Sequence, residues 1–190
     1  MLTDIITRER FTTTTWNGGE TTELCILPRG ASYALRDFHM RISMATVALA
    51  HSVFTNLPGV ARYISPLEGA FILRIDDRAP VVLHPGEILG FDGGAHVECE
   101  GYGRDLNLML RGRAGSMAYG DEAVPEYGET CFVFAREPLS LRVGREKIEL
   151  PCESLLRVDP EGDERLTLQA NAAFYAFLIK NANGGRPDER

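Results

Sequence analysis

Polar side chains that could bind or act on a small molecule alternate with leucines in one short segment, RDLNLMLR (104–111). Successive side chains of a β-strand point to opposite faces, so Asp105, Asn107 and Met109 share one face of this segment. A carboxylate, an amide and a thioether in a row could form one wall of a ligand pocket. The alternative is that Asp105 and Asn107 point to solvent, as most carboxylates and amides do.

Two arginines could supply positive charge to the same pocket. In RISMATV (41–47) the alternation places Arg41 and Ser43 on one face of a largely apolar strand, and Arg62 follows in GVARYI (59–64). A guanidinium group is planar and can grip a carboxylate through two parallel hydrogen bonds. The arginines therefore indicate a small carboxylate as ligand, although a surface position would explain each of them taken alone.

Other catalytic and cofactor signatures are missing from the sequence. The four histidines lack the spacing of a metal site, and the four cysteines form no C-x-x-C pair. There is no G-x-S-x-G elbow, and Gly18-Gly19 is not followed by the G-K-[ST] of a phosphate-binding loop. We expect no metal and no cofactor. Asp105, acting as the general base of a metal-free isomerase or lyase, remains the catalytic alternative.

The charge balance limits the partners. Acidic residues outnumber basic ones by 27 to 20, giving a formal net charge of −7. An acidic chain is repelled by phosphate backbones, so we expect no nucleic acid as partner. No apolar run is long enough to span a membrane, and the start of the chain lacks a signal-peptide pattern. With widely separated cysteines, these features predict a cytoplasmic protein that does not bind membranes.

The elements that must position these residues are β-strands. Short apolar runs between Gly, Pro and Asp predict an all-β fold with few, short helices, as a sandwich, jelly roll or barrel. Asp76-Asp77-Arg78 and Val143-Gly144-Arg145 are expected to be hairpin turns. Strands are predicted near 22–27, 39–48, 60–64, 70–76, 80–84, 87–91, 95–100, 104–111, 130–135, 139–143, 146–150, 153–158, 165–170 and 173–180.

A faint internal repeat suggests two halves. LRIDDRAPVVLHPGEIL (73–89) resembles LRVGREKIELPCESL (141–155) when two residues are dropped from the turn. A duplicated strand unit in a chain of this length predicts two small barrels. We expect one half over 1–113 and a second, smaller half over 114–180, with the Gly- and Ala-rich stretch 114–129 as the connection. The polar tail 181–190 is predicted to be disordered.

Motifs in series link the sequence to a known family. WNGGETTELCILP, FHMRISMATVALAHSVFTNLPGVARYISPLEG, LGFDGG and GRDLNLMLRG resemble the HutD/Ves family in order and spacing, over residues 10 to 113. The resemblance implies a cupin-like fold of RmlC-like jelly-roll barrels, with two halves in one chain (a bicupin). It also implies a regulatory role in bacterial histidine utilisation, with a small acid such as formylglutamate as ligand and no metal.

The family motifs also imply a set of ligand-binding positions in this chain. They carry over onto Trp16, Gly18, Gly19, Thr21, Thr22, Arg41, Ser43, Arg62, Phe91, Asp92, Asp105, Asn107 and Met109. Three functions remain open. The first is non-enzymatic binding of a small carboxylate, which we favour over catalysis, and the second is the metal-free isomerase or lyase. The third is a ligand-free β scaffold for protein association, and a homodimer is compatible with any of them.

Overall fold

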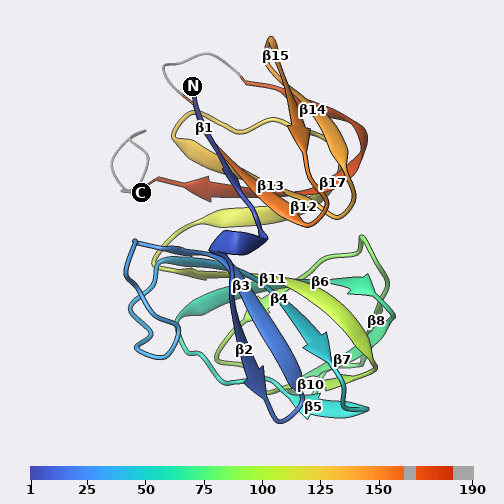
Figure 1. Ribbon diagram of the computed structural model, residues 1–190. Coiled ribbons are helices and arrows are strands. Elements are labelled where there is room, and N and C mark those ends of the chain that lie inside the picture. The colour runs from blue at the N-terminus through green and yellow to red at the C-terminus, as the bar shows by residue number, and fades with distance from the viewer. Residues whose placement is uncertain (161–165, 182–190) are drawn as a thin grey trace. The chain divides into compact units, whose positions relative to one another are not determined.

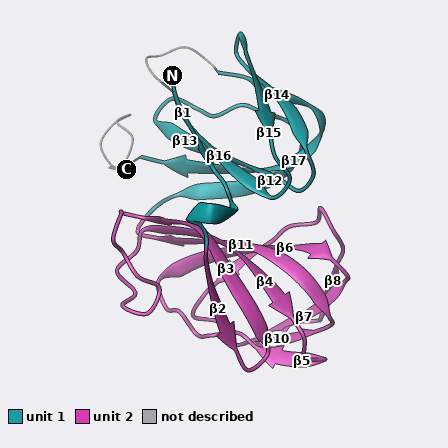
Figure 2. Cartoon of the chain, viewed as in Figure 1, with its two compact units in different colours: residues 1–11, 113–190 teal, residues 12–112 magenta. Residues whose placement is uncertain are grey.

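The computed structural model describes residues 1–160 and 166–181, and these form an all-β protein, as predicted (Figure 1). Within this part of the chain, only the short 3-10 helix η1 (Arg8–Arg10) is helical. The chain divides into two compact units, one of residues 12–112 and one of residues 1–11 with 113–190 (Figure 2).

Residues 12–112 form two antiparallel sheets. The six-stranded sheet has the order β2-β3-β4-β11-β6-β9, and the four-stranded sheet has the order β5-β10-β7-β8. Ile64, Phe71, Leu73 and Val97 are buried in a shared apolar cluster, which supplies much of the free energy that holds this unit folded. The strands are β2 (Thr12–Trp16), β3 (Gly19–Leu27), β4 (Met40–Val47), β5 (His51–Val53), β6 (Val60–Glu68), β7 (Phe71–Ile75), β8 (Val81–Leu83), β9 (Leu89–Asp92), β10 (Val97–Glu100) and β11 (Gly103–Arg111).

The other unit is one seven-stranded antiparallel sheet. Its order is β1-β16-β13-β17-β14-β15, and β12 pairs with β17. Cys131, Val133, Leu141, Leu156 and Phe174 belong to a closely packed apolar cluster within it. The strands are β1 (Leu2–Ile6), β12 (Gly115–Ala123), β13 (Glu129–Ala135), β14 (Leu139–Val143), β15 (Glu146–Leu150), β16 (Ser154–Asp159) and β17 (Leu168–Lys180).

The two units share an order of strand pairing. In residues 12–112, β6 pairs with β9, and the hairpin β7–β8 lies between these two strands in the sequence. In the other unit, β13 pairs with β16, and the hairpin β14–β15 lies between them in the sequence. The two hairpins contain the repeated sequences, and their turns fall at Asp76-Asp77-Arg78 and at Gly144-Arg145, where they were predicted. Gly144 has φ +59°, a left-handed conformation that glycine adopts without strain. This shared order is compatible with two cupin-like halves.

Several predicted boundaries differ from the structure. Residues 115–123 of the expected connection form β12, whose Gly and Ala residues still pair in register with β17. The two strands expected near 165–170 and 173–180 are one strand, β17, which pairs first with β14 and then with β13. The short strands β1, β2 and β5 were not predicted, because their few residues carry little apolar alternation.

The division into halves also differs at the N-terminus. Residues 1–11 belong with residues 113–190 and not with the first half, because Leu2–Ile6 pair with Leu155–Asp159 at the edge of the seven-stranded sheet. Between the units the boundary at residue 112 is one residue from the predicted one. Apart from Asn181, the predicted disordered tail lies outside the described residues.

Candidate functional site

A cavity of about 310 Å³ lies in the unit of residues 12–112. Its lining comes from the six-stranded sheet, from β5 and the residues after it, and from one loop residue. The side chains are Thr14 and Trp16 of β2, Thr21 of β3, Arg41, Ser43, Ala45 and Val47 of β4, Arg62 of β6, Asp105, Asn107 and Met109 of β11, then Ser52, Val53, Phe54, Thr55 and Tyr33.

The register of the sheet gathers the polar residues on one face. Met109 lies opposite Arg41 on one side and opposite Arg62 on the other, so the thioether separates two guanidinium groups in one row. In the next row Asn107 lies opposite Ser43, and Asp105 follows one row further along β11. Directly opposite residues point to the same side of a sheet. The predicted alternation of β4 and β11 therefore places these side chains together.

Arg41 is held by three neighbours. Its Nε donates to Glu23 Oε2 at 2.7 Å and its Nη1 donates to Ser43 Oγ at 3.1 Å. Its guanidinium carbon lies 4.4 Å from the centre of the Tyr33 ring, and Arg36 stacks against the same ring at 4.0 Å. Arg41 is only 6% exposed. A buried charge with a carboxylate partner is compensated, so Arg41 contributes orientation more than free positive charge.

Arg62 is held differently, beside two aromatic rings that also pack against each other. Its guanidinium carbon lies 5.0 Å from the centre of the Phe54 ring and 5.1 Å from that of Phe91, and its Nη1 donates to the carbonyl of Thr55 at 3.3 Å. The side chain is 6% exposed, and its Nε has no hydrogen-bond partner among the described residues. Burial lowers the pKa of Arg62 from its ordinary value. A buried donor without a partner is costly, and an anionic ligand would relieve that cost.

Asp105 is the buried carboxyl group of the cavity. It is 3% exposed and accepts a hydrogen bond from Asn107 Nδ2. Burial raises the pKa of Asp105 to about 7, against the opposing effects of Asn107, of the Arg62 charge and of a backbone hydrogen bond from Ala45. A carboxyl group with this pKa can hold or release a proton near neutral pH.

Backbone hydrogen bonds join the FDGG motif (91–94) to the LPG motif (57–59) and to the residue that follows it, next to Arg62. Leu57 N–H donates to the carbonyl of Gly93 at 2.6 Å, and Gly93 N–H donates to the carbonyl of Val60 at 2.7 Å. A Cβ at Gly93 would lie 2.7 Å from the Leu57 carbonyl oxygen and 3.2 Å from Arg62 Cδ, so only glycine permits this approach. Asp92 closes the turn by accepting from Gly94 N–H at 2.6 Å. Of the predicted positions, Phe91 thus supports Arg62 and Asp92 supports the turn after β9, and neither lines the cavity.

The opening WNGG motif builds the hairpin that carries Trp16. Trp16 pairs with Gly19 across the turn Asn17-Gly18, and the indole ring lies over Gly18, where a Cβ would come within 1.9 Å of Trp16 Cζ3. A Cβ at Gly19, whose φ is +148°, would lie 1.8 Å from the carbonyl oxygen of Thr46. The two glycines are therefore structural, and Trp16 is the member of the motif that reaches the cavity.

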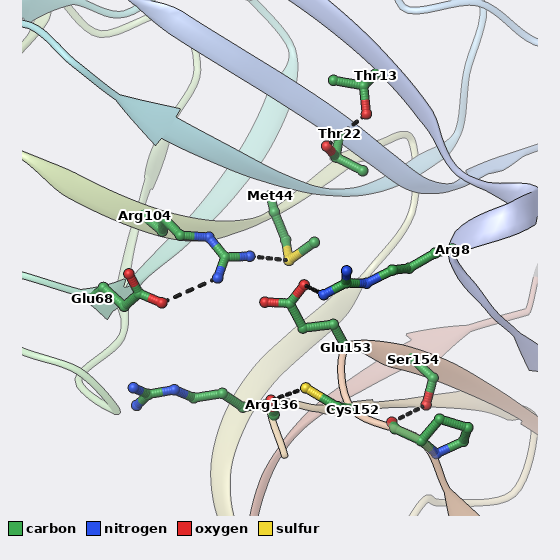
Figure 3. A network of polar contacts seen from close by, with 11 residues as sticks. Arg8, Thr13, Thr22, Met44, Glu68, Arg104, Arg136, Cys152, Glu153 and Ser154 are labelled. Carbon is green, nitrogen blue, oxygen red and sulfur yellow. Dashed lines mark hydrogen bonds and ion pairs between the residues drawn. The ribbon is translucent and has the colours of Figure 1, made fainter. Parts of the chain in front are cut away.

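Thr22 lies on the opposite face of the sheet from the cavity. Its Oγ1 shares a hydrogen bond of 2.9 Å with Thr13 Oγ1 (Figure 3). Thr22 pairs in register with Met44, and Met44 Sδ accepts from Arg104 Nη2 at 3.6 Å. Arg104 also binds Glu68 Oε1 at 3.1 Å (Figure 3). Alternation thus sends Thr21 into the cavity and Thr22 away from it.

The structure adds site residues that sequence reasoning missed. Glu23 of WNGGETTELCILP holds Arg41, and Phe54 of FHMRISMATVALAHSVFTNLPGVARYISPLEG packs against Arg62. Both stood inside quoted motifs, so the motifs themselves were the signal. Tyr33 comes from the loop between β3 and β4, where no strand alternation indicates which way a side chain points.

Metal-ligand clusters and membrane-spanning helices are absent from the described residues. No group of three or more His, Cys, Asp or Glu side chains there is placed to hold a metal ion. Likewise, in residues 1–160 and 166–181 we find no helix of the length and apolarity that crossing a membrane needs.

Comparison with known proteins identifies relatives over most of the chain. The model of the HutD family matches residues 8–176. Protein Ves of Escherichia fergusonii is 36% identical over 98 residues, and this alignment spans 49% of the present chain and 49% of Ves, about half of the relative's length.

Solved structures share the fold. A conserved protein of unknown function from Pseudomonas aeruginosa PAO1 matches with a TM-score of 0.81 and 22% identity, covering 95% of this chain and 100% of the other. HutD from Pseudomonas fluorescens SBW25, solved in a formate condition, matches with a TM-score of 0.73 and 21% identity over the same shares. A cupin 2 barrel protein from Leptotrichia buccalis matches at 0.55 and 10% identity, covering 94% and 96%. The predicted cupin-like, all-β fold is confirmed.

Proposed function

The chain belongs to the HutD family, and from that premise we propose that the cavity of residues 12–112 binds a small carboxylate. In this proposal the protein is a non-enzymatic, cytoplasmic sensor that modulates histidine utilisation. Its ligand is an acid of the formylglutamate type. Neither nucleic acid nor a membrane is a partner, no cofactor takes part, and a second copy of the chain is a candidate partner.

The observation that carries the proposal is the state of Arg62. This guanidinium is buried, faces the cavity and has no ion-pair partner in the described residues, and its Nε is an unused donor. A carboxylate bound there would satisfy the donor and the charge together. A charge-assisted hydrogen bond contributes roughly 1.5–3 kcal/mol, which corresponds to about tenfold or more in affinity.

The neighbours of Arg62 support a ligand that also carries a neutral polar group. Asn107 can hydrogen-bond a formyl or amide group, and Ser43 lies opposite it on the neighbouring strand β4. Met109 and Trp16 offer apolar contact to a short carbon chain. A ligand pocket typically combines apolar walls with a few polar groups in this way.

A thermal-shift screen tests the proposal. The chain and its Arg62→Ala variant are heated with formate, acetate, succinate, urocanate and N-formylglutamate as sodium salts, and sodium chloride serves as the ionic-strength control. A ligand that binds only the native state must raise the melting temperature. We expect at least one carboxylate to stabilise the parent and not the variant. Equal shifts in parent and variant, or none in either, would refute the proposed site.

A catalytic role has one observation in its favour. Asp105 is buried in the cavity and has a pKa of about 7, which suits a general base at neutral pH. A metal-free isomerase or lyase is therefore the second candidate. It requires turnover of a bound acid, followed by NMR of the substrate, and loss of that turnover in folded Asp105→Asn. A ligand-free scaffold is less well supported, since the cavity of about 310 Å³ is not filled by side chains.

A further inference from the structure

The cavity contains two guanidinium groups but only one of them has a carboxylate partner. Arg41 is paired with Glu23 at 2.7 Å, whereas no ion pair joins Arg62 to any acidic group of the described residues. The remaining acidic group on the cavity wall is Asp105. The same positive charge, that of Arg62, would therefore stabilise both ionised Asp105 and a bound anion.

Asp105 is placed so that this competition has an effect. It lies on the same sheet face as Arg62, two positions before Asn107 and four before Met109, which pairs in register with Arg62. It is 3% exposed, and in the described part of the chain its side chain accepts from Asn107 but forms no ion pair. A buried carboxylate without a paired cation is expensive to ionise. What favours its ionised form is first the hydrogen bond from Asn107, then the Arg62 charge and then the backbone hydrogen bond from Ala45.

We propose that the cavity takes up its anionic ligand together with one proton, and that Asp105 holds this proton. This inference rests on the proposed carboxylate site. A bound carboxylate neutralises Arg62 and adds a negative charge near Asp105, and both changes favour the protonated carboxyl group. Protonated Asp105 then becomes a hydrogen-bond donor to the ligand. The site accordingly selects an anion with a neutral acceptor, such as a carbonyl oxygen, beside its carboxylate.

The other titratable groups around Asp105 do not take this role. Arg41 on β4 and Glu23 on β3 form their own ion pair. Burial and the Asp105 charge raise the pKa of the Cys99 thiol on β10 to about 12, so it stays neutral. Tyr33, in the loop before β4, packs its ring between Arg36 and Arg41. Arg62 on β6 is the cation that the ligand and Asp105 share.

The direction of the pH dependence follows from this linkage. At a pH below the pKa of Asp105 in the free protein, about 7, the group already holds its proton and affinity for the anion is highest. At higher pH, binding requires proton uptake, and affinity falls by about tenfold per pH unit until the pKa of the complex is reached. In Asp105→Asn, which mimics the protonated group, this fall disappears.

Calorimetry measures the proton directly. N-formylglutamate and formate are titrated into the chain at about pH 6 and about pH 8, in two buffers with different ionisation enthalpies, because the difference between buffers gives the protons exchanged. We expect little uptake at the lower pH and uptake approaching one proton per site at the higher pH. At about pH 8, Asp105→Asn should bind with the affinity that the parent shows at about pH 6, and without proton uptake. Asp77→Asn, the same change in an exposed turn, should behave as the parent.

A second measurement needs neither a variant nor tight binding. The side-chain carboxyl signals of ¹³C-labelled aspartates are followed against pH, with and without saturating formate. Titration of Asp105 near neutral pH, displaced upward by formate, supports the proposal. Titration at the ordinary pKa of aspartate, or an anion that binds without proton uptake, overturns it and leaves the carboxylate site standing. Failure of every carboxylate to bind overturns both.

Discussion

Glu23 on β3 fixes Arg41 on β4 by accepting a hydrogen bond of 2.7 Å from the guanidinium Nε, at the wall of the cavity. Arg41 is 7% and Glu23 is 23% exposed in the side chain, so the pair is only partly screened by water. The pair turns one of the two cavity arginines into a positioned and compensated group. In the proposed site, Arg62 is left as the group that would meet the ligand's charge.

Removal of the Glu23 charge should therefore change both stability and binding. In Glu23→Gln the Arg41 charge loses its partner, and we expect the free energy of unfolding to fall by about 1–2 kcal/mol, since the pair is partly buried. Anion affinity should rise several-fold at the same time, because the cavity becomes more positive. Urea denaturation and calorimetry with formate measure the two effects. Lower affinity in a folded Glu23→Gln protein would mean that positioning of Arg41 matters more than its charge.

Arg62 should be sensitive to shape as well as to charge. Arg62→Ala is expected to weaken carboxylate binding by about tenfold or more, since a charge-assisted hydrogen bond is lost. Arg62→Lys keeps the charge but loses the planar group that lies against Phe54 and Phe91, and we expect it to recover only part of the affinity. Isothermal calorimetry of both variants decides this. Full recovery with lysine would show that the stacked, forked geometry is unimportant.

The two glycines of the WNGG hairpin should respond differently to alanine. In Gly19→Ala the new Cβ meets the backbone oxygen of Thr46, which cannot move without breaking β3–β4 pairing, and we expect destabilisation of at least about 3 kcal/mol. In Gly18→Ala the Cβ meets only the indole of Trp16, which can rotate away. That variant should keep most of its stability and change the fluorescence of Trp16, the only tryptophan. Equal stability losses would contradict this difference.

Stability should depend on pH through Asp105. Its pKa is raised to about 7 in the folded chain from about 4 when unfolded, so the folded state binds the proton more tightly. The stabilisation from this proton is complete below about pH 4 and decreases as the pH rises to about 7. Above about pH 7 the free energy of unfolding no longer depends on this group. The slope is at most about 1.4 kcal/mol per pH unit. Relative to the parent, Asp105→Asn should gain stability between about pH 4 and pH 7, which denaturant titrations at several pH values would reveal.

The sequence predicted the polar wall of the cavity because strand alternation has a fixed period. Arg41 and Ser43, and likewise Asp105, Asn107 and Met109, reach one cavity as the period of two requires. Motif membership was less informative. Phe91 and Asp92 stand in a motif, yet Phe91 packs against Arg62 and Asp92 closes a turn, since a motif does not distinguish a residue that lines a cavity from one that positions its neighbour.

The rest depended on tertiary contacts that the sequence does not encode locally. Tyr33 reaches Arg41 from a loop, where side-chain direction follows no period. The raised pKa of Asp105 reflects burial among residues from several strands, which only the folded unit defines. β12 was taken for a connection because its Gly and Ala residues resemble a linker, and its pairing with β17 overrides that local preference.

The contrast between the two related strand arrangements bears on how such a chain can evolve. The unit with β13 and β16 is filled by a continuous apolar cluster, whereas the unit with β6 and β11 keeps a hollow lined by charged and amide groups. If the cavity binds an acid as proposed, substitutions on its wall can alter which acid is recognised while the filled unit stays folded. Substitutions in the filled cluster, such as Phe174→Ala, change volume in a packed interior and cost folding directly. The wall of the cavity can therefore change without removing the apolar contacts that hold the other unit folded.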